Sequence, residues 1–304
     1  MNVRPIQPIT GAASGHGVSE GCRYLLLHLL ARRRFARWGV PAPATAVADL
    51  TVALTTTPAR LPFIYPTLNG LLDQTVRPRR IVLAVPRWSQ REQRPYRVPA
   101  LLRRQTAVEV LACDRDWGPA TKLIPALRQP GRGPDDAVLA VDDDNIYPRR
   151  FVETFVRRAP EMPEAALSLR GWPMPASLRW RDSRALKGTE IAAPVRTDVI
   201  TGCGGILVRP GFFDAAFFDY EPAPPGAFFV DDIWISGHLA RRNVPKFVIP
   251  FSGPWIYAPA AAALCGRALD RQENRSGETN DRVIAYFSAD WRRGAAAAAE
   301  GGPR

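Results

Sequence analysis

The sequence predicts an α/β fold in which a mainly parallel sheet is covered by helices on both faces. Two observations support this class. Strand-like and helix-like stretches alternate between residues 49 and 159, and the strand-like stretches are continuously apolar. Continuous apolar strands are typical of parallel sheets that are buried on both faces, and alternation with helices is the pattern of α/β proteins.

The individual elements follow from local residue patterns. Strands are predicted at residues 49–57, 79–86, 107–114 and 136–144, because each stretch is β-rich or continuously apolar. Helices are predicted at 65–74, 118–129 and 148–159. The first has leucines at helical spacing, the second tolerates Pro119 in its first turn, and Pro148 begins the third. The second half of the chain has a less regular pattern.

The organised part of the chain is predicted to be one domain at residues 49–290. Residues 1–48 read as a basic leader that is partly disordered, because they contain a small polar stretch and a linker-like GVPAPATA. Residues 291–304 form a low-complexity tail. The 304 residues, 46% of them hydrophobic, are enough for one substantial core.

The net charge of +12 would suit a polyanionic partner such as nucleic acid, an anionic membrane or a phosphorylated substrate. Only three of the 41 basic residues are lysines, and the arginines are spread along the chain. The chain has no dense basic run interleaved with aromatic residues, so no nucleic-acid partner is expected. A protein that binds nucleic acid or a membrane surface through charge alone remains one alternative function.

Four widely spaced cysteines, with no C-x-x-C pair, favour reduced thiols and a cytoplasmic protein over a disulfide framework. No secretory signal is expected at the N-terminus. The apolar stretch YLLLHLLA is too short to span a bilayer and is followed by clustered arginines. Residues 24–38 would therefore allow peripheral contact with the inner face of a membrane, or would form a helix packed on the domain.

The stretch AVLAVDDDNIYP places three aspartates at the end of a predicted buried strand. Side chains two apart on a strand share a face, so Asp142 and Asp144 would converge while Asp143 would lean the other way or into the turn. Two converging carboxylates offer hard oxygen ligands to Mg²⁺ or Mn²⁺, and ligands in parallel sheets gather at this carboxyl edge. A solvated acidic turn is the alternative.

A second acidic pair, Asp231 and Asp232, precedes the predicted helix in FFVDDIWISGHL. Acidic residues at a helix start are favourable simply because they cap the helix. Next to apolar and aromatic neighbours, one of these carboxylates could also have the raised proton affinity of a general base. His238 on the same helix is read as an ordinary helix-face residue, with proximity to the site as the alternative.

A third polar element, CDRDWGPATK, places Asp116 and Lys122 on either side of a Gly-Pro turn at a helix start, where backbone N–H groups favour anions. A nucleotide contact and an ordinary turn are equally compatible with it. The sequence has no Walker loop, no G-x-G-x-x-G motif and no nucleophile elbow.

In this order, the strand ending T-T-T-P-x-R, the strand ending D-x-D and the acidic pair before a helix resemble nucleotide-sugar glycosyltransferases of the GT-A (Rossmann-like) fold, near family 2 and the exostosin-like enzymes. The resemblance covers about residues 49–290. It implies transfer of a sugar, from a UDP-sugar by preference, to an acceptor hydroxyl on a carbohydrate or lipid-linked molecule, with Mn²⁺ or Mg²⁺ as cofactor.

The resemblance also implies roles by position. Asp144 and Asp142 would bind the metal, and Asp232 or Asp231 would deprotonate the acceptor. The residues that would contact the nucleotide sugar are Thr55, Thr57, Pro58, Arg60, Asp116, Lys122, Asp142, Asp143, Gly204 and Gly205. A Mg²⁺-dependent nucleotidyltransferase, which also uses acidic residues at a sheet edge, is the second alternative function.

Overall fold

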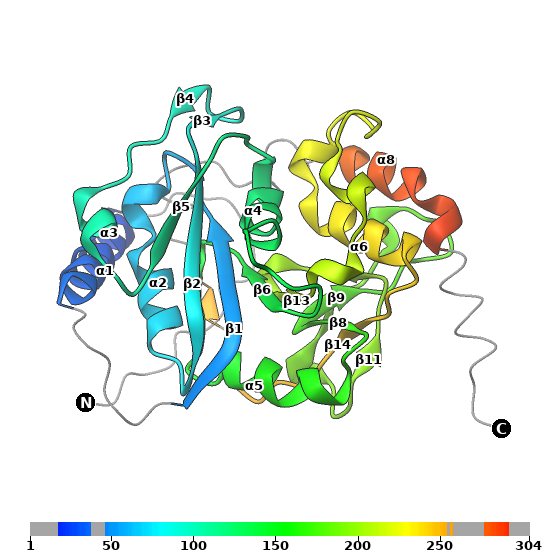
Figure 1. The fold of residues 1–304 in the computed structure, drawn as a ribbon, viewed down its shortest axis with the longest axis horizontal. Helices are drawn as coiled ribbons and strands as arrows, with labels where there is room; N and C mark the ends of the chain where they lie inside the picture. Colours follow the sequence, from blue (N-terminus) through cyan, green and yellow to red (C-terminus); the bar gives the residue numbers. More distant parts are fainter. Residues whose placement is uncertain (1–17, 38–45, 254–255, 258–276, 292–304) are drawn as a thin grey trace.

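The computed structural model describes residues 18–37, 46–253, 256–257 and 277–291 (Figure 1). Its centre is an eight-stranded sheet with the order β11-β14-β8-β13-β6-β1-β2-β5. In chain order, these strands are β1 (Ala46–Thr55), β2 (Val76–Pro86), β5 (Glu109–Cys113), β6 (Ala137–Val141), β8 (Ala166–Ser168), β11 (Val195–Arg196), β13 (Ile206–Val208) and β14 (Lys246–Val248).

Four of the seven neighbouring strand pairs in this sheet are parallel: β1 with β2 and with β6, β2 with β5, and β14 with β8. The strands β13 and β11 supply the three antiparallel pairs. The predicted α/β class with a mainly parallel sheet is therefore confirmed. The smaller sheets pair β3 (Trp88–Ser89) with β4 (Arg94–Pro95), β7 (Asn145–Ile146) with β15 (Ile256–Tyr257), and β9 (Arg170–Trp172) with both β10 (Leu186–Lys187) and β12 (Val199–Ile200).

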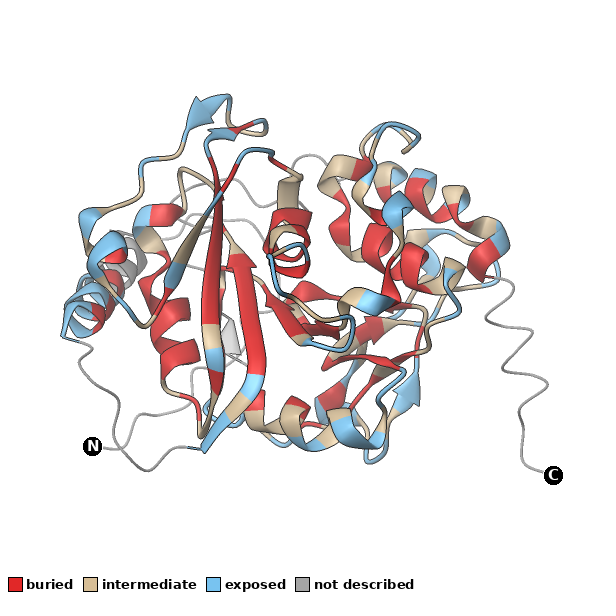
Figure 2. Cartoon of the chain, viewed as in Figure 1, coloured by how far each residue is buried: buried red, intermediate tan, exposed pale blue. Residues whose placement is uncertain are grey.

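Helices cover both faces of the sheet, as predicted (Figure 1). The α-helices are α1 (Val18–Ala36), α2 (Tyr65–Leu72), α3 (Ala100–Arg104), α4 (Ile124–Leu127), α5 (Phe151–Arg158), α6 (Asp231–Arg241) and α8 (Glu278–Tyr286). Along β6, Leu139 and Val141 pack with α1, α2 and α5, whereas Val138 and Ala140 pack with α4, α6 and α8. This alternation explains the continuous apolar strands, because both faces are buried (Figure 2).

Two predicted elements differ from the structure in ways that affect the site. The strand predicted at 136–144 ends at Val141, so Asp143 and Asp144 lie in a turn. The helix predicted at 118–129 is wrong in form: it is a 3₁₀ helix at Gly118–Lys122 followed by the single turn of α4. Pro125 explains the break, because proline lacks the N–H of a continuing helix and clashes with the preceding turn.

Helix α1 lies within the predicted leader and packs on α2. His28, Ala31 and Phe35 form its buried stripe. The ring of Phe35 lies 5.3 Å from that of Tyr65, and the Asn69 amide donates to the Ala31 carbonyl oxygen at 2.9 Å. The described part of this stretch therefore forms a helix that packs on the domain through one face, and peripheral membrane contact stays a prediction. Within the described ranges, no helix is long and apolar enough to cross a bilayer. Cys113 and Cys203 are free thiols, and the other two cysteines lie where side chains are not described.

His238 is buried in an aromatic cluster on α6, away from the acidic pair at the start of that helix. Its ring contacts those of Phe217, Trp234 and Phe287 at centroid distances of 5.5, 4.5 and 5.1 Å. Neither ring nitrogen has a hydrogen-bond partner in the described part of the chain. Burial, with a smaller effect of Arg241, lowers the pKa of His238 to about 3. The side chain is therefore a core residue that stays neutral.

We expect His238 to make the fold acid-sensitive. Because its pKa is lowered in the folded state, the unfolded chain binds a proton that the folded chain does not, and stability falls as pH drops from about 6.5 toward 3. Relative to His238→Phe, the wild type should lose about 2 kcal/mol of unfolding free energy between pH 7 and pH 5. Urea unfolding at several pH values measures this. Between pH 7 and 8.5, the difference in unfolding free energy between the wild type and His238→Phe should stay constant. If that difference also stayed constant down to pH 5, His238 would not have a lowered pKa in the folded state.

Candidate functional site

The three aspartates lie at the carboxyl end of β6, beside the carboxyl end of β1. Asp142 directly follows the strand, and its backbone N–H donates to the Tyr147 hydroxyl at 2.9 Å. Asp143 is buried, and its carboxylate accepts a 2.5 Å hydrogen bond from Thr56, just after β1. Its carbonyl oxygen accepts from Thr67 of α2 at 2.8 Å. The acidic turn is therefore held by fixed hydrogen bonds and is not a freely solvated loop.

Arg60 forms ion pairs with two of the three carboxylates. Its Nη2 lies 3.0 Å from Asp143 Oδ1 and 2.7 Å from Asp144 Oδ2. Burial alone would lower the pKa of Arg60, but Asp143 and Asp144 raise it, so the guanidinium stays charged. Burial also raises the pKa of Asp144 to about 6, although Arg60 opposes the shift. The prediction that Asp144 shares a face with Asp142 is wrong, because strand alternation ends at Val141 and the turn directs Asp144 to the same cation as Asp143.

Lys122 is the partner of Asp142 and joins it to the acidic pair of α6. Its buried Nζ lies 2.5 Å from Asp142 Oδ1, 2.7 Å from Asp231 Oδ2 and 3.9 Å from Asp232 Oδ1. Burial would lower the pKa of Lys122, but the three carboxylates raise it. Lys122 comes from the 3₁₀ helix Gly118–Lys122, so three segments far apart in sequence meet at one ammonium group.

The two acids of α6 differ in environment. Asp231 is buried and in direct contact with Lys122, with a side chain that is 11% exposed. The Asp232 side chain is 31% exposed, and its Oδ1 accepts from the Gly202 N–H at 2.9 Å. Burial and the neighbouring Asp231 raise the pKa of Asp232 well above the usual value, while Lys122 opposes the shift. Of the pair, Asp232 is therefore the carboxylate that a substrate could reach.

Asp116 lies beside a small cavity of about 220 Å³ that is also lined by Gln90, Trp117, Tyr220 and Phe228. The Asp116 carboxylate accepts from the backbone N–H groups of Gln90 and Gly118, both at 2.8 Å. Burial raises the pKa of Asp116 against these hydrogen bonds. Gly118 has a φ of +60°, and a Cβ there would lie 2.2 Å from the Phe228 carbonyl oxygen, so this turn requires glycine.

The predicted contacts after β1 occupy the turn that carries Arg60. The Thr55 hydroxyl donates to the Ala84 carbonyl oxygen at 2.8 Å, so it bridges neighbouring strands. The Thr57 carbonyl oxygen accepts from the backbone N–H groups of Arg60 and Leu61, at 3.0 and 2.9 Å, and Pro58 lies within that turn. The structure therefore brings Arg60 to the acidic cluster, while Thr55 stabilises the sheet.

The predicted glycines lie against other parts of the protein. A Cβ at Gly204 would lie 2.5 Å from the backbone nitrogen of Arg170. A Cβ at Gly205, whose φ is +73°, would lie 2.7 Å from the Phe151 ring. Their small size is thus explained by packing, and contact with a sugar stays a prediction. At Gly202, by contrast, a Cβ would lie 2.1 Å from Lys122 Nζ and 2.4 Å from Asp142 Oδ1. Gly202 makes room for that ion pair.

Asp142 and Asp144 contact different cations, Lys122 and Arg60, and each would have to exchange that contact for the metal to supply a carboxylate oxygen to one divalent cation. Their oxygens have the right chemistry for Mg²⁺ or Mn²⁺. Among the described residues, no group of three His, Cys, Asp or Glu side chains is arranged to hold a metal. Any remaining ligands would be water and substrate phosphate, which is the common way in which proteins bind Mg²⁺. The donor set therefore fits an ion that is bound together with a phosphorylated substrate.

Sequence reasoning missed Gly202, Thr56 and Gln90, which hold Asp232, Asp143 and Asp116 respectively. Thr56 could have been found, because it stands within the same T-T-T-P-x-R stretch as Thr55 and Arg60. Gly202 stands in the same TGCGG stretch as Gly204 and Gly205, but only the fold shows which glycine faces the lysine. Gln90 carries no local signal at all.

The fold and this edge define an α/β protein whose charged side chains gather at the carboxyl ends of parallel strands. No protein-family model and no curated protein matches the chain. The chain is similar to a solved structure of residues 1–349 of TarS from S. aureus, with a TM-score of 0.44 and 14% sequence identity over 80% of this chain and 71% of that one.

Proposed function

We propose that this protein is a glycosyltransferase that moves a sugar from a nucleoside diphosphate donor, a UDP-sugar by preference, to an acceptor hydroxyl on a carbohydrate or lipid-linked molecule. One observation carries the proposal: Lys122 joins Asp142, Asp231 and Asp232 at the carboxyl end of β6. The ion pairs of Arg60 with Asp143 and Asp144 lie in the turn that follows the same strand. Substrates of α/β sheets bind at this edge. The cations there can face a diphosphate, and a carboxylate with a raised pKa can accept a proton.

The donor would lie between the Asp116 cavity and the acidic turn. The cavity offers aromatic side chains and a carboxylate to a nucleobase, and Arg60 and Lys122 offset part of the negative charge of the carboxylates beside which the diphosphate would bind. Asp142 and Asp144 would hold Mn²⁺ or Mg²⁺. When bound, such an ion would neutralise the negative charge that builds on a departing diphosphate.

Asp232 would act as the general base. The acceptor hydroxyl gives its proton to the Asp232 carboxylate as its oxygen forms a bond to the anomeric carbon. The bond between that carbon and the phosphate oxygen breaks, and the nucleoside diphosphate leaves with the electron pair. The Gly202 N–H orients Asp232, while Asp231 holds Lys122 in place. This division of roles follows from the exposure of the two side chains.

Metal dependence can be tested through donor binding. Calorimetry should show that UDP binds at least about tenfold more tightly with Mn²⁺ than with EDTA, because the ion offsets repulsion between the phosphates and the carboxylates. Asp144→Ala should weaken binding by a similar factor in Mn²⁺ and should have little effect in EDTA. Asp136→Ala is the matched control, because Asp136 lies just before the other end of β6 with a half-exposed side chain. Equal UDP affinity with Mn²⁺ and with EDTA would contradict the metal site.

A further inference from the structure

Helix α1 has a buried face and an exposed apolar face. His28, Ala31 and Phe35 face the domain. On the rest of the helix, Leu26, Leu27, Leu29 and Leu30 are 39–56% exposed. These are four of the seven large apolar side chains that are exposed in the described part of the chain. Isolated exposed leucines need no explanation, but a cluster of this kind on one helix marks an interaction surface.

The same exposed face continues into a basic segment. The four exposed leucines form what we call the leucine surface. Arg33 and Arg37 are exposed and follow Leu26 and Leu30 at helical spacing, so they extend this surface along the helix. Arg32 and Arg34 are also exposed, and Arg34 pairs with Asp73 of the α2 region. Residues 21–48 contain no aspartate or glutamate. The leucine surface is therefore bordered by positive charge.

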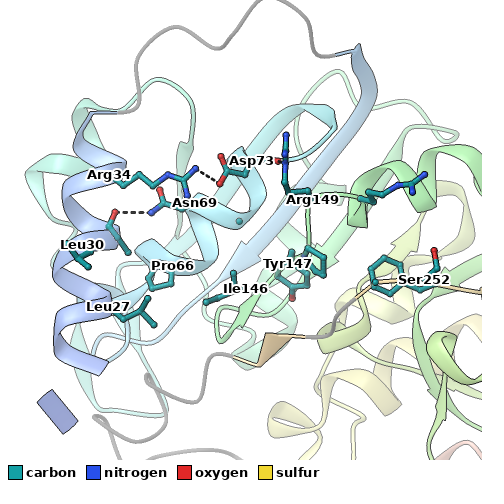
Figure 3. A pocket seen from close by; sticks show the side chains of 16 residues that line it. Leu27, Leu30, Arg34, Pro66, Asn69, Asp73, Ile146, Tyr147, Arg149 and Ser252 are labelled. Carbon is teal, nitrogen blue, oxygen red and sulfur yellow. Dashed lines mark hydrogen bonds and ion pairs between the residues drawn. The ribbon is translucent and has the colours of Figure 1, made fainter. Parts of the chain in front are cut away.

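A cavity of about 630 Å³ opens beside this surface, between α1, α2 and the turn after β7. Figure 3 shows Leu27, Leu30, Pro66 and Ile146 lining it, with Arg34 and Arg149 on the same side as Asp73. The lining is thus mainly apolar, and Arg34 and Arg149 place positive charge beside it. Tyr147 lines the cavity, and its hydroxyl accepts a hydrogen bond from the Asp142 N–H, so the cavity lies close to the candidate site.

We propose that the exposed face of α1, from Leu26 to Arg37, docks on the surface of an anionic lipid bilayer. The leucines enter the boundary between headgroups and acyl chains, and Arg33 and Arg37 contact lipid phosphates. Charge complementarity favours this partner, because the segment combines exposed leucines with arginines and lacks acidic residues. The helix would lie in the membrane plane, since it is not long and apolar enough to span. This inference does not depend on the proposed reaction.

Vesicle co-sedimentation of the full chain tests the proposal. Binding to phosphatidylcholine vesicles that contain phosphatidylglycerol should exceed binding to pure phosphatidylcholine by at least about tenfold, and should fall at high salt. The double variant Leu26→Ser/Leu29→Ser should lower the partition coefficient at least about tenfold, because two half-exposed side chains no longer enter the lipid. Arg33→Gln/Arg37→Gln should lower it roughly 30-fold on anionic vesicles alone.

Val195→Ser provides a matched control, because Val195 is an exposed apolar residue on β11, the edge strand at the opposite end of the sheet from β5. It should leave vesicle binding unchanged, and circular dichroism should show that each variant is folded. Unchanged binding of the double leucine variant, or equal binding to neutral and anionic vesicles, overturns the proposal. A third result would also overturn it: the wild type binds no vesicles but self-associates, and Leu26→Ser/Leu29→Ser abolishes that self-association. The surface would then bind a second copy of the chain.

Discussion

Replacing Lys122 by methionine is expected to lower the free energy of unfolding by about 3–5 kcal/mol at pH 7, and Tm by roughly 10 °C. Methionine keeps the aliphatic length of lysine but removes the charge. The Lys122 side chain is only 5% exposed, and its ammonium group contacts Asp142 and Asp231 at 2.5 and 2.7 Å. Without it, the buried Asp231 carboxylate loses its counter-ion and is left with little access to water. Chemical denaturation measures the loss.

Lys187→Met is the matched control for this variant. Lys187 pairs with Glu190 at 2.9 Å, but both side chains are about half exposed, so its loss should cost under about 1 kcal/mol. The second change Asp231→Asn should restore part of the stability of Lys122→Met, because it removes a charge left unpaired. The deficit of Lys122→Met should also shrink at acidic pH as the carboxylates become protonated. A loss as small as that of Lys187→Met would contradict the buried cluster.

Replacing Asp232 by asparagine is expected to lower the turnover of sugar transfer by at least about 100-fold, which is the usual contribution of a positioned general base. Asparagine preserves the size of the side chain and can still accept from the Gly202 N–H, so the fold should be retained. UDP affinity should stay close to the wild-type value, because Asp232 is assigned to the acceptor step. Steady-state transfer assays and calorimetry on the same preparation separate the two effects.

The pH profile of the reaction gives an independent test of Asp232. The base must be ionised, so turnover should fall as pH drops through its pKa, and burial beside Asp231 places that limb above the ordinary range of an aspartate. Asp231→Asn is the comparison variant, which should lose mainly stability through Lys122 and keep more turnover than Asp232→Asn. If Asp231→Asn abolished transfer while Asp232→Asn left it unchanged, the base would be Asp231.

Local sequence patterns were sufficient for β1, β2, β5 and β6, but not for the other four strands of the central sheet or for the ends of the elements. The apolar stretches at 49–57 and 136–144 correspond to β1 and β6, because continuous burial on both faces leaves a clear apolar signal. The end of β6 at Val141 has no such signal: polar residues suit the last position of a strand and the first position of a turn equally. Because β6 ends before the predicted position, Asp144 lies in the turn and contacts Arg60.

By itself, the sequence determined that acidic residues follow a buried strand and begin a helix, that Arg60 follows the first predicted strand, and that Lys122 follows a Gly-Pro turn. Only the tertiary structure decided which charges meet. Arg60 reaches Asp143 and Asp144, Lys122 joins β6 to α6, and Gly202 leaves room for that contact. The physical reason is that local periodicity reports burial along one segment. Pairing between segments that are far apart in the sequence, such as Lys122 and Asp231, depends instead on how the helices pack and how far each side chain reaches.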